Sequence, residues 1–291
     1  MPDLNEMVLP AVWSLARRAL ANGPAPSLDA LIDRLTPVGL IRRSAEGASR
    51  SRHVGPSLRM LRQLGILVED GDGAVALADL TWDEARFRHA VAVALLAVSE
   101  DDDPWQIREG ATRLEHHLEI AVAWTQVLGL NSGIENWQTA AEALDRQFGV
   151  DRPLLRDTAP YNTLERFATW LGVTAVVGGQ LVPDPTPLVR SALDTLLPEP
   201  SCSAGDLLQR SAEHFPWLPH GRLGRAVAEH MRIVPDSSAV DGRFPEGLSL
   251  ALVRLEQEHA IELDAGDDAK MRVLLSFGGA PERGVARVVR A

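Results

Sequence analysis

One pattern recurs three times along the 291-residue chain and constrains its fold more than any other feature. An apolar-periodic helix runs into a short β-branched strand, a turn and a second short strand, over residues 56–77, 161–183 and 248–277. The turns are expected at residues 70–73, 178–179 and 265–269. Recurrence of this kind indicates one supersecondary unit used repeatedly.

The end of each helix is also marked. Gly65 and Gly172 stand where a helix C-terminus favours a left-handed backbone, which glycine adopts at little cost. In the third copy the sequence predicts that Ala260 replaces this stop glycine.

Shorter helical segments precede each copy, and Ser27 is a good N-cap for one of them. The segments are residues 10–20 and 27–35, then 136–148 and 152–158, then 203–215 and 220–231. This order predicts a mostly α protein with short two-stranded wings, built of tandem winged helix-turn-helix-like modules.

We expect three modules along the chain. Residues 1–80 form the first, residues 81–198 a helical segment plus the second, and residues 199–291 the third, which ends in a basic tail. Residues 198–203 are interpreted as a linker.

The composition suggests a cytoplasmic protein. The apolar fraction is 45%, but no stretch approaches the roughly 20 apolar residues of a membrane span, so no membrane contact is expected. The N-terminus has no secretory signal pattern. Cys202 is the only cysteine, so an internal disulfide is impossible and a reducing compartment fits best.

The net charge of −11 argues against a protein that coats nucleic acid over its whole surface. The charge is uneven along the chain: zero over residues 1–80, −8 over 81–198, −7 over 199–269 and +4 over 270–291. An anion-binding surface should therefore be sought at the two ends.

The best candidate is a basic stretch that leads into the third helix of the first module. It contains a single acidic residue, Glu46, and six arginines: Arg42, Arg43, Arg50, Arg52, Arg59 and Arg62. In a winged helix this region meets the major groove, so we predict contact with double-stranded DNA, to which Ser49, Ser51 and Ser57 add hydroxyl contacts to phosphate. The alternative is a solvated loop on a module used for protein contacts.

The equivalent helices of the other two copies are poor DNA readers. The second offers one arginine and two large aromatics, and the third carries Glu256 and Glu258, which repel phosphate. We therefore expect these acidic modules to contact protein subunits. Trp217, between two prolines, is the tryptophan most suited to an exposed partner contact.

No catalytic centre is evident, and we predict that the chain is not an enzyme. Residues 115–119 (EHHLE) contain metal-ligand types, but adjacent histidines on a helix point about 100° apart and cannot share an ion. The paired glycines lack the phosphate-loop lysine and the dinucleotide-binding spacing. We predict no metal and no cofactor.

The opening segment LNEMVLPAVWSLARRAL (residues 4–20), the total length, and the wing units LGILVEDGDGAVAL and HAIELDAG resemble the DpdG family. That family is a component of bacterial gene clusters that place 7-deazaguanine bases in DNA and restrict unmodified DNA. The resemblance implies a role in DNA restriction or phage defence beside ATPase, nuclease or helicase-like subunits. It implies no catalytic residues.

The sequence therefore predicts a non-catalytic, DNA-engaging or scaffolding subunit of a bacterial multi-protein assembly. Two alternatives remain open. A winged-helix transcriptional regulator would be a homodimer that binds a palindromic site, and a pure protein-interaction adaptor would have no affinity for nucleic acid.

Overall fold

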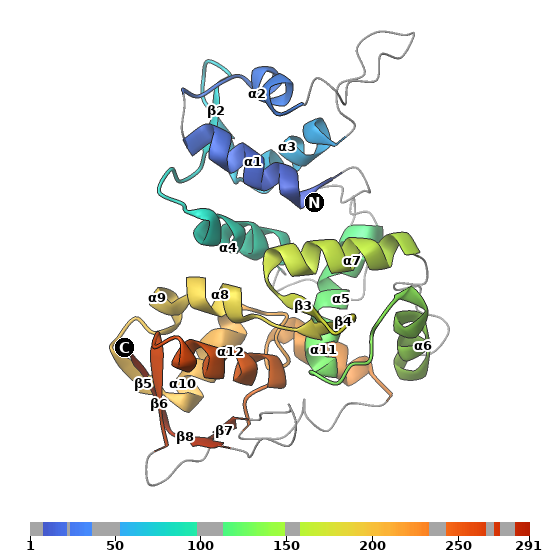
Figure 1. Ribbon diagram of the computed structural model, residues 1–291, viewed down its shortest axis with the longest axis vertical. Helices are drawn as coiled ribbons and strands as arrows, with labels where there is room; N and C mark the ends of the chain where they lie inside the picture. The colour runs from blue at the N-terminus through green and yellow to red at the C-terminus, as the bar shows by residue number, and fades with distance from the viewer. Residues whose placement is uncertain are drawn as a thin grey trace. The chain divides into compact units, whose positions relative to one another are not determined.

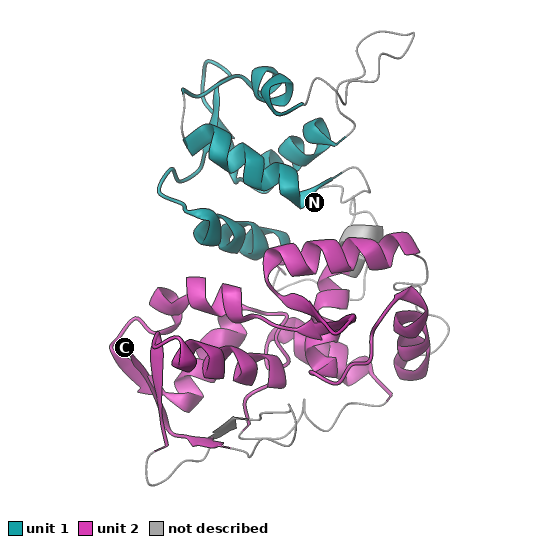
Figure 2. Cartoon of the chain, viewed as in Figure 1, with its two compact units in different colours: residues 1–95, 107–115 teal, residues 96–106, 116–291 magenta. Residues whose placement is uncertain are grey.

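The computed structural model describes residues 8–21, 24–36, 53–97, 113–148, 158–232, 243–265, 271–273 and 283–291. Over these residues the chain is mostly helical and carries small antiparallel sheets, which confirms the predicted fold class (Figure 1). The chain forms two compact units, residues 1–95 with 107–115 and residues 96–106 with 116–291 (Figure 2). The three-module division stays a prediction.

The first unit contains four described helices and one hairpin: α1 (Pro10–Ala21), α2 (Leu28–Leu35), α3 (Val54–Gln63), β1 (Leu67–Glu69), β2 (Val75–Leu77) and α4 (Glu84–Leu95). Helix α1 packs on α2, α3 and α4. Its Trp13 is fully buried and donates from Nε1 to the carbonyl of Ser57, 2.8 Å away. This contact fixes α1 against α3.

The second unit begins with a similar arrangement, which is a set of helices followed by a two-stranded hairpin. It consists of α5 (Arg113–Leu128), which belongs to this unit from His116 onward, α6 (Trp137–Phe148), α7 (Thr158–Leu171), β3 (Thr174–Val177) and β4 (Gln180–Pro183). Described α5 side chains from Leu118 onward are buried, and Gln126 donates to the carbonyl of Val173 at 2.7 Å. The predicted turn at Gly178 and Gly179 is confirmed, with φ of 60° and 84°.

The rest of the second unit forms a third arrangement. Its elements are α8 (Thr186–Ser191), α9 (Leu193–Leu196), β5 (Ser201–Ser203), α10 (Ala204–His214), α11 (Arg222–His230), α12 (Glu246–Gln257), β6 (Ile261–Asp264), β7 (Met271–Val273), β8 (Arg283–Val285) and β9 (Arg287–Arg290). Here the sequence-based interpretation is wrong in two places. Strand β6 pairs with the distant β9 rather than with the next strand, and the supposed linker contains β5, which also pairs with β9.

The three arrangements share one connectivity. In each arrangement, the segment just before a helix with an N-cap side chain lies against the second strand of the wing. In the first, Ser27 bridges Ala74; in the second, the carbonyl of Ile134 accepts from the amide of Leu181 at 2.8 Å; in the third, β5 pairs with β9. The following helix then starts at an N-cap residue, in order Ser27, Asn136 and Ser203, whose side chain accepts a backbone amide. The repeat seen in sequence is thus also a repeat of topology.

The last helix of each arrangement ends in the same way. A left-handed residue follows the C-cap, and the next amide reaches back to a carbonyl one turn earlier: Ile66 to Leu61, Val173 to Ala168 and Ala260 to Leu255. The left-handed residues are Gly65, Gly172 and His259. The prediction of Ala260 for the third position was therefore one residue too late.

Candidate nucleic-acid interface

The shared helix end gives a common register for the outward face of the last helix in each arrangement, which is α3, α7 or α12. In the first, Arg62 and Arg59 lie three and six residues before Gly65, and both are exposed. The opposite face of α3 is fully buried through Leu58 and Leu61. Packing of the apolar face therefore turns both arginines toward solvent.

Two of the six predicted arginines are thereby located. Arg42, Arg43, Arg50 and Arg52, like Ser49 and Ser51, lie outside the described residues. The predicted hydroxyl contact of Ser57 is wrong, because this side chain is completely buried. Its Oγ accepts from the amide of Leu9 at 2.9 Å and donates to the carbonyl of His53 at 2.7 Å, so it is committed to the core.

The wing beside α3 is acidic. Arg62 pairs with Glu69 on β1 at 2.9 Å, with both side chains more than 40% exposed. The carboxylate of Asp70 accepts the amides of Asp72 and Ala74, which holds the turn. Two exposed acids, Asp70 and Asp72, thus follow Glu69 around the hairpin.

Arg59 is in a different position. No ion pair or hydrogen bond is seen for its side chain within the described part of the chain, and its guanidinium lies beside Gly55, one turn nearer the start of α3. The positive charge of α3 that is not offset by the wing is therefore Arg59. It lies toward the end of the helix that the basic stretch enters.

In the second arrangement the equivalent positions of α7 are Arg166 and Thr169. Arg166 is only partly exposed, with Nε and Nη2 shielded from solvent, and its guanidinium carbon lies 5.3 Å from the ring centre of Phe167. A guanidinium packed in this way has less freedom to reach a phosphate.

In the third arrangement the equivalent positions of α12 are Val253 and Glu256. Glu256 accepts from Arg283 at 2.8 Å and from the amide of Leu263 at 3.2 Å. The hydrogen bond from Arg283 holds the pKa of Glu256 below its ordinary value, so this carboxylate stays charged and paired. A negative charge here disfavours phosphate.

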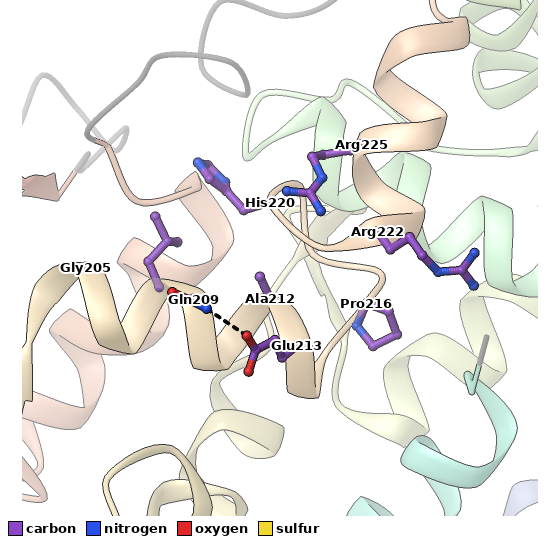
Figure 3. A pocket seen from close by; sticks show the side chains of 9 residues that line it. Gly205, Gln209, Ala212, Glu213, Pro216, His220, Arg222 and Arg225 are labelled. Atoms are coloured by element: carbon purple, nitrogen blue, oxygen red, sulfur yellow. Dashed lines mark hydrogen bonds between the residues drawn. The ribbon is translucent and has the colours of Figure 1, made fainter. Parts of the chain in front are cut away.

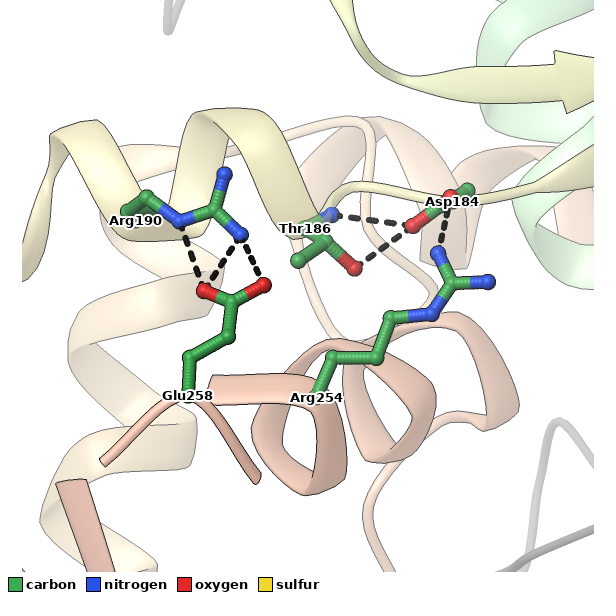
Figure 4. Close-up of polar contacts among 5 residues, drawn as sticks. All are labelled: Asp184, Thr186, Arg190, Arg254 and Glu258. Carbon is green, nitrogen blue, oxygen red and sulfur yellow. Dashed lines mark hydrogen bonds and ion pairs between the residues drawn. The ribbon is translucent and has the colours of Figure 1, made fainter. Parts of the chain in front are cut away.

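Two further ion pairs lie at α12 and its C-terminal end, as Figure 4 shows. Arg254 on α12 pairs with Asp184, and Arg190 on α8 reaches both carboxylate oxygens of Glu258, the nearer at 2.5 Å. Asp184 lies just before α8 and Glu258 just after α12, so the two pairs join these segments of the chain.

Two further observations bear on the type of site. Within the described ranges, no three His, Cys, Asp or Glu side chains gather as metal ligands would, and no helix there is long and apolar enough to span a membrane. Trp217, predicted as an exposed partner contact, is instead buried and packs on Phe215 with ring centres 5.2 Å apart.

Comparison with known proteins gives one match. No curated protein and no solved structure is significantly similar to this chain. A family model described as DpdG-like matches residues 4–269, nearly the whole length. The chain therefore belongs to the DpdG-like family.

Proposed function

We propose that this protein is a non-catalytic subunit that engages duplex DNA through α3 and the basic stretch before it, and binds protein partners through its second unit. Membership of the DpdG-like family supports a place in the 7-deazaguanine DNA modification and restriction machinery. The winged helix-turn-helix assignment is supported by the connectivity that recurs three times.

One observation carries the DNA half of this proposal. Of the three helices in equivalent positions, only α3 presents two exposed arginines, whereas α7 has one shielded arginine and α12 a paired glutamate. Exposed arginines suit phosphate because the planar guanidinium donates two hydrogen bonds at once. Such contacts position the protein on DNA and do not read its sequence.

The acidic wing limits how a DNA duplex can approach α3. A duplex laid along both α3 and the β1–β2 hairpin would bring phosphates against Glu69, Asp70 and Asp72. We infer that DNA approaches the start of α3, beside which the Arg59 guanidinium lies and which the other predicted arginines precede in sequence, and that the wing points away from the DNA. Glu69 then weakens binding by holding Arg62.

The test is binding of labelled duplex DNA by the full chain across a salt series. Replacing Arg59 and Arg62 together by alanine should weaken binding and reduce the salt slope by roughly one unit per lost phosphate contact. Arg146→Ala on α6 is the matched control, because Arg146 is also exposed and belongs to the second unit. Glu69→Gln should tighten binding by freeing Arg62.

The rival function is a pure protein-interaction adaptor, and the Arg62–Glu69 pair is the observation that favours it. If the unmodified chain shows no duplex binding at low salt, the DNA half of the proposal is wrong and the adaptor function stands. If Arg146→Ala weakens binding as much as the double variant, the contact is diffuse and does not involve α3.

A further inference from the structure

A groove of about 570 Å³ runs between α10 and α11 in the second unit. Its lining includes three apolar residues, Leu208, Ala212 and Pro216, here called the apolar floor, and three basic residues, His220, Arg222 and Arg225, here called the rim. Figure 3 shows the lining side chains. A volume of a few hundred cubic ångströms accommodates one or two anchoring side chains of a bound segment. The groove belongs to the second unit and α3 to the first, so no residue of the groove takes part in the DNA contact proposed above.

The turn between the two helices is rigid. The amides of Leu223 and Gly224 both donate to the carbonyl of Pro216, at 2.9 and 3.1 Å. A Cβ on Gly224 would lie 2.0 Å from the carbonyl oxygen of Leu218, and one on Gly221 would lie 2.5 Å from that of Pro216. Only glycine fits at these two positions, so the groove is formed before any partner arrives.

Helix α11 carries basic side chains into the groove. One face of α11 is buried through Leu223 and Val227, while Arg222 and Arg225 line the groove. Helix α11 thus places positive charge in a stretch, residues 199–269, whose net charge is −7.

The charges favour a protein ligand over nucleic acid. Glu213 lies in the groove, hydrogen-bonded to Gln209 at 2.9 Å, and exposed acids such as Asp206 and Glu229 occur on the same two helices. A nucleic-acid backbone needs a continuous basic track, and these carboxylates interrupt it. A short peptide needs only one apolar anchor for the floor and a carboxylate for the rim.

We infer that the α10–α11 groove binds a short acidic peptide segment of a protein partner. An apolar side chain of the peptide would pack on Leu208, Ala212 and Pro216, and its carboxylates would pair with Arg225, Arg222 and His220. The inference rests on the protein-binding half of the proposed function and names the site and the chemistry of its ligand. Apolar anchors in a groove with charges at the rim are a common mode of peptide recognition.

The experiment is selection from a displayed library of random short peptides on the full-length protein, followed by affinity measurement of the enriched peptides. Acidic sequences with an apolar anchor should be enriched. Arg225→Glu should weaken their binding at least about tenfold, Arg225→Gln should weaken it less, and Arg146→Glu should leave it unchanged. Arg225 and Arg146 are both exposed, so unchanged circular dichroism spectra are expected for all three variants.

Three outcomes would overturn the inference: no enrichment, enrichment of neutral or basic peptides, or equal binding to Arg225→Glu. A labelled single-stranded oligonucleotide that binds the protein and loses affinity only in Arg225→Glu would identify nucleic acid as the ligand instead. The Arg59/Arg62 double variant should bind the selected peptides normally. The two experiments therefore distinguish an error in the proposed DNA contact from an error in the proposed peptide-binding groove.

Discussion

Single backbone positions set the end of the last helix in each arrangement. Gly65, Gly172 and His259 all have φ between 57° and 78°, a region that costs non-glycine residues roughly 1–2 kcal/mol. The two glycines were predictable because glycine is the usual residue there. His259 was not, because nothing local marks a histidine as left-handed, and the prediction moved to the neighbouring Ala260.

Gly172 should tolerate a side chain less well than Gly65. A Cβ at Gly172 would lie 2.8 Å from Cβ of Pro187, whereas nothing lies within 4 Å of one at Gly65. Gly65→Ala should lower the free energy of unfolding by about 1 kcal/mol through backbone strain alone. Gly172→Ala should cost about 1–3 kcal/mol more because of the clash. Urea denaturation of both variants measures this, and equal losses would contradict the role of Pro187.

His259→Gly should stabilise the protein. Removing the left-handed strain gains roughly 1–2 kcal/mol, offset by about 0.5–1 kcal/mol for the extra backbone freedom of glycine when unfolded. The net gain expected in the free energy of unfolding is about 0.5–1 kcal/mol. Thermal denaturation reports the sign directly, and a decrease in Tm would mean that the His259 side chain makes a contact worth more than the strain.

At the scale of elements, two ion pairs of unequal burial join residues 184–190, which include most of α8, to α12 and the residue after it. The side chain of Asp184 is 11% exposed and accepts from Thr186 Oγ1 at 2.6 Å as well as from Arg254, whereas both partners of the Arg190–Glu258 pair are 46% exposed. We expect the burial of a pair, and not its number of hydrogen bonds, to decide how much it contributes to the free energy of unfolding.

We therefore expect Asp184→Asn to lower the free energy of unfolding by about 1–3 kcal/mol, as for a hydrogen-bonded charge removed from a mostly buried site. Glu258→Gln should cost less than about 1 kcal/mol, because the Arg190–Glu258 pair is solvated. Denaturant titrations of the two variants under the same buffer test the order. A larger loss of unfolding free energy for Glu258→Gln than for Asp184→Asn would contradict the expectation that the buried pair contributes more.

Glu256 links α12 to β8 and gives a pH dependence of known sign. Hydrogen bonding by Arg283 lowers the pKa of Glu256 in the folded state, so its stabilising contribution is full above the ordinary glutamate pKa of about 4.3. That contribution is lost as the pH falls through the lowered folded-state value. The stability difference between the unmodified chain and Glu256→Gln should therefore shrink as the medium is acidified below about pH 4.3. A constant difference would contradict the pairing.

The sequence could predict strands that pair with a neighbour nearby in the chain, but not strands whose partner lies many residues away. The β1–β2 and β3–β4 hairpins close through short turns, so local glycines and β-branched residues were sufficient. The partner of β6 is β9, more than twenty residues later, and β9 also pairs with β5. Such pairing depends on tertiary packing, which no local pattern encodes, and a strand was accordingly mistaken for a linker.

At the scale of the whole chain, net charge distinguishes the repeats. The net charge of residues 1–80 is zero and that of residues 81–269 is strongly negative, which the sequence alone revealed. Which arginines are exposed, shielded or paired could not be read from sequence, because it depends on wing residues such as Glu69 folding back on α3. The buried Trp217 illustrates the same limit, since its prolines belong to a packed turn.

The most direct test of the central claim is hydrogen–deuterium exchange of the full chain with and without duplex DNA at low salt. We predict that DNA slows exchange in α3 and in the peptides that carry Arg42 to Arg52, with no change in α7 or α12. Slowed exchange in α7 or α12, with α3 unaffected, would contradict the assignment of the DNA contact to the first repeat.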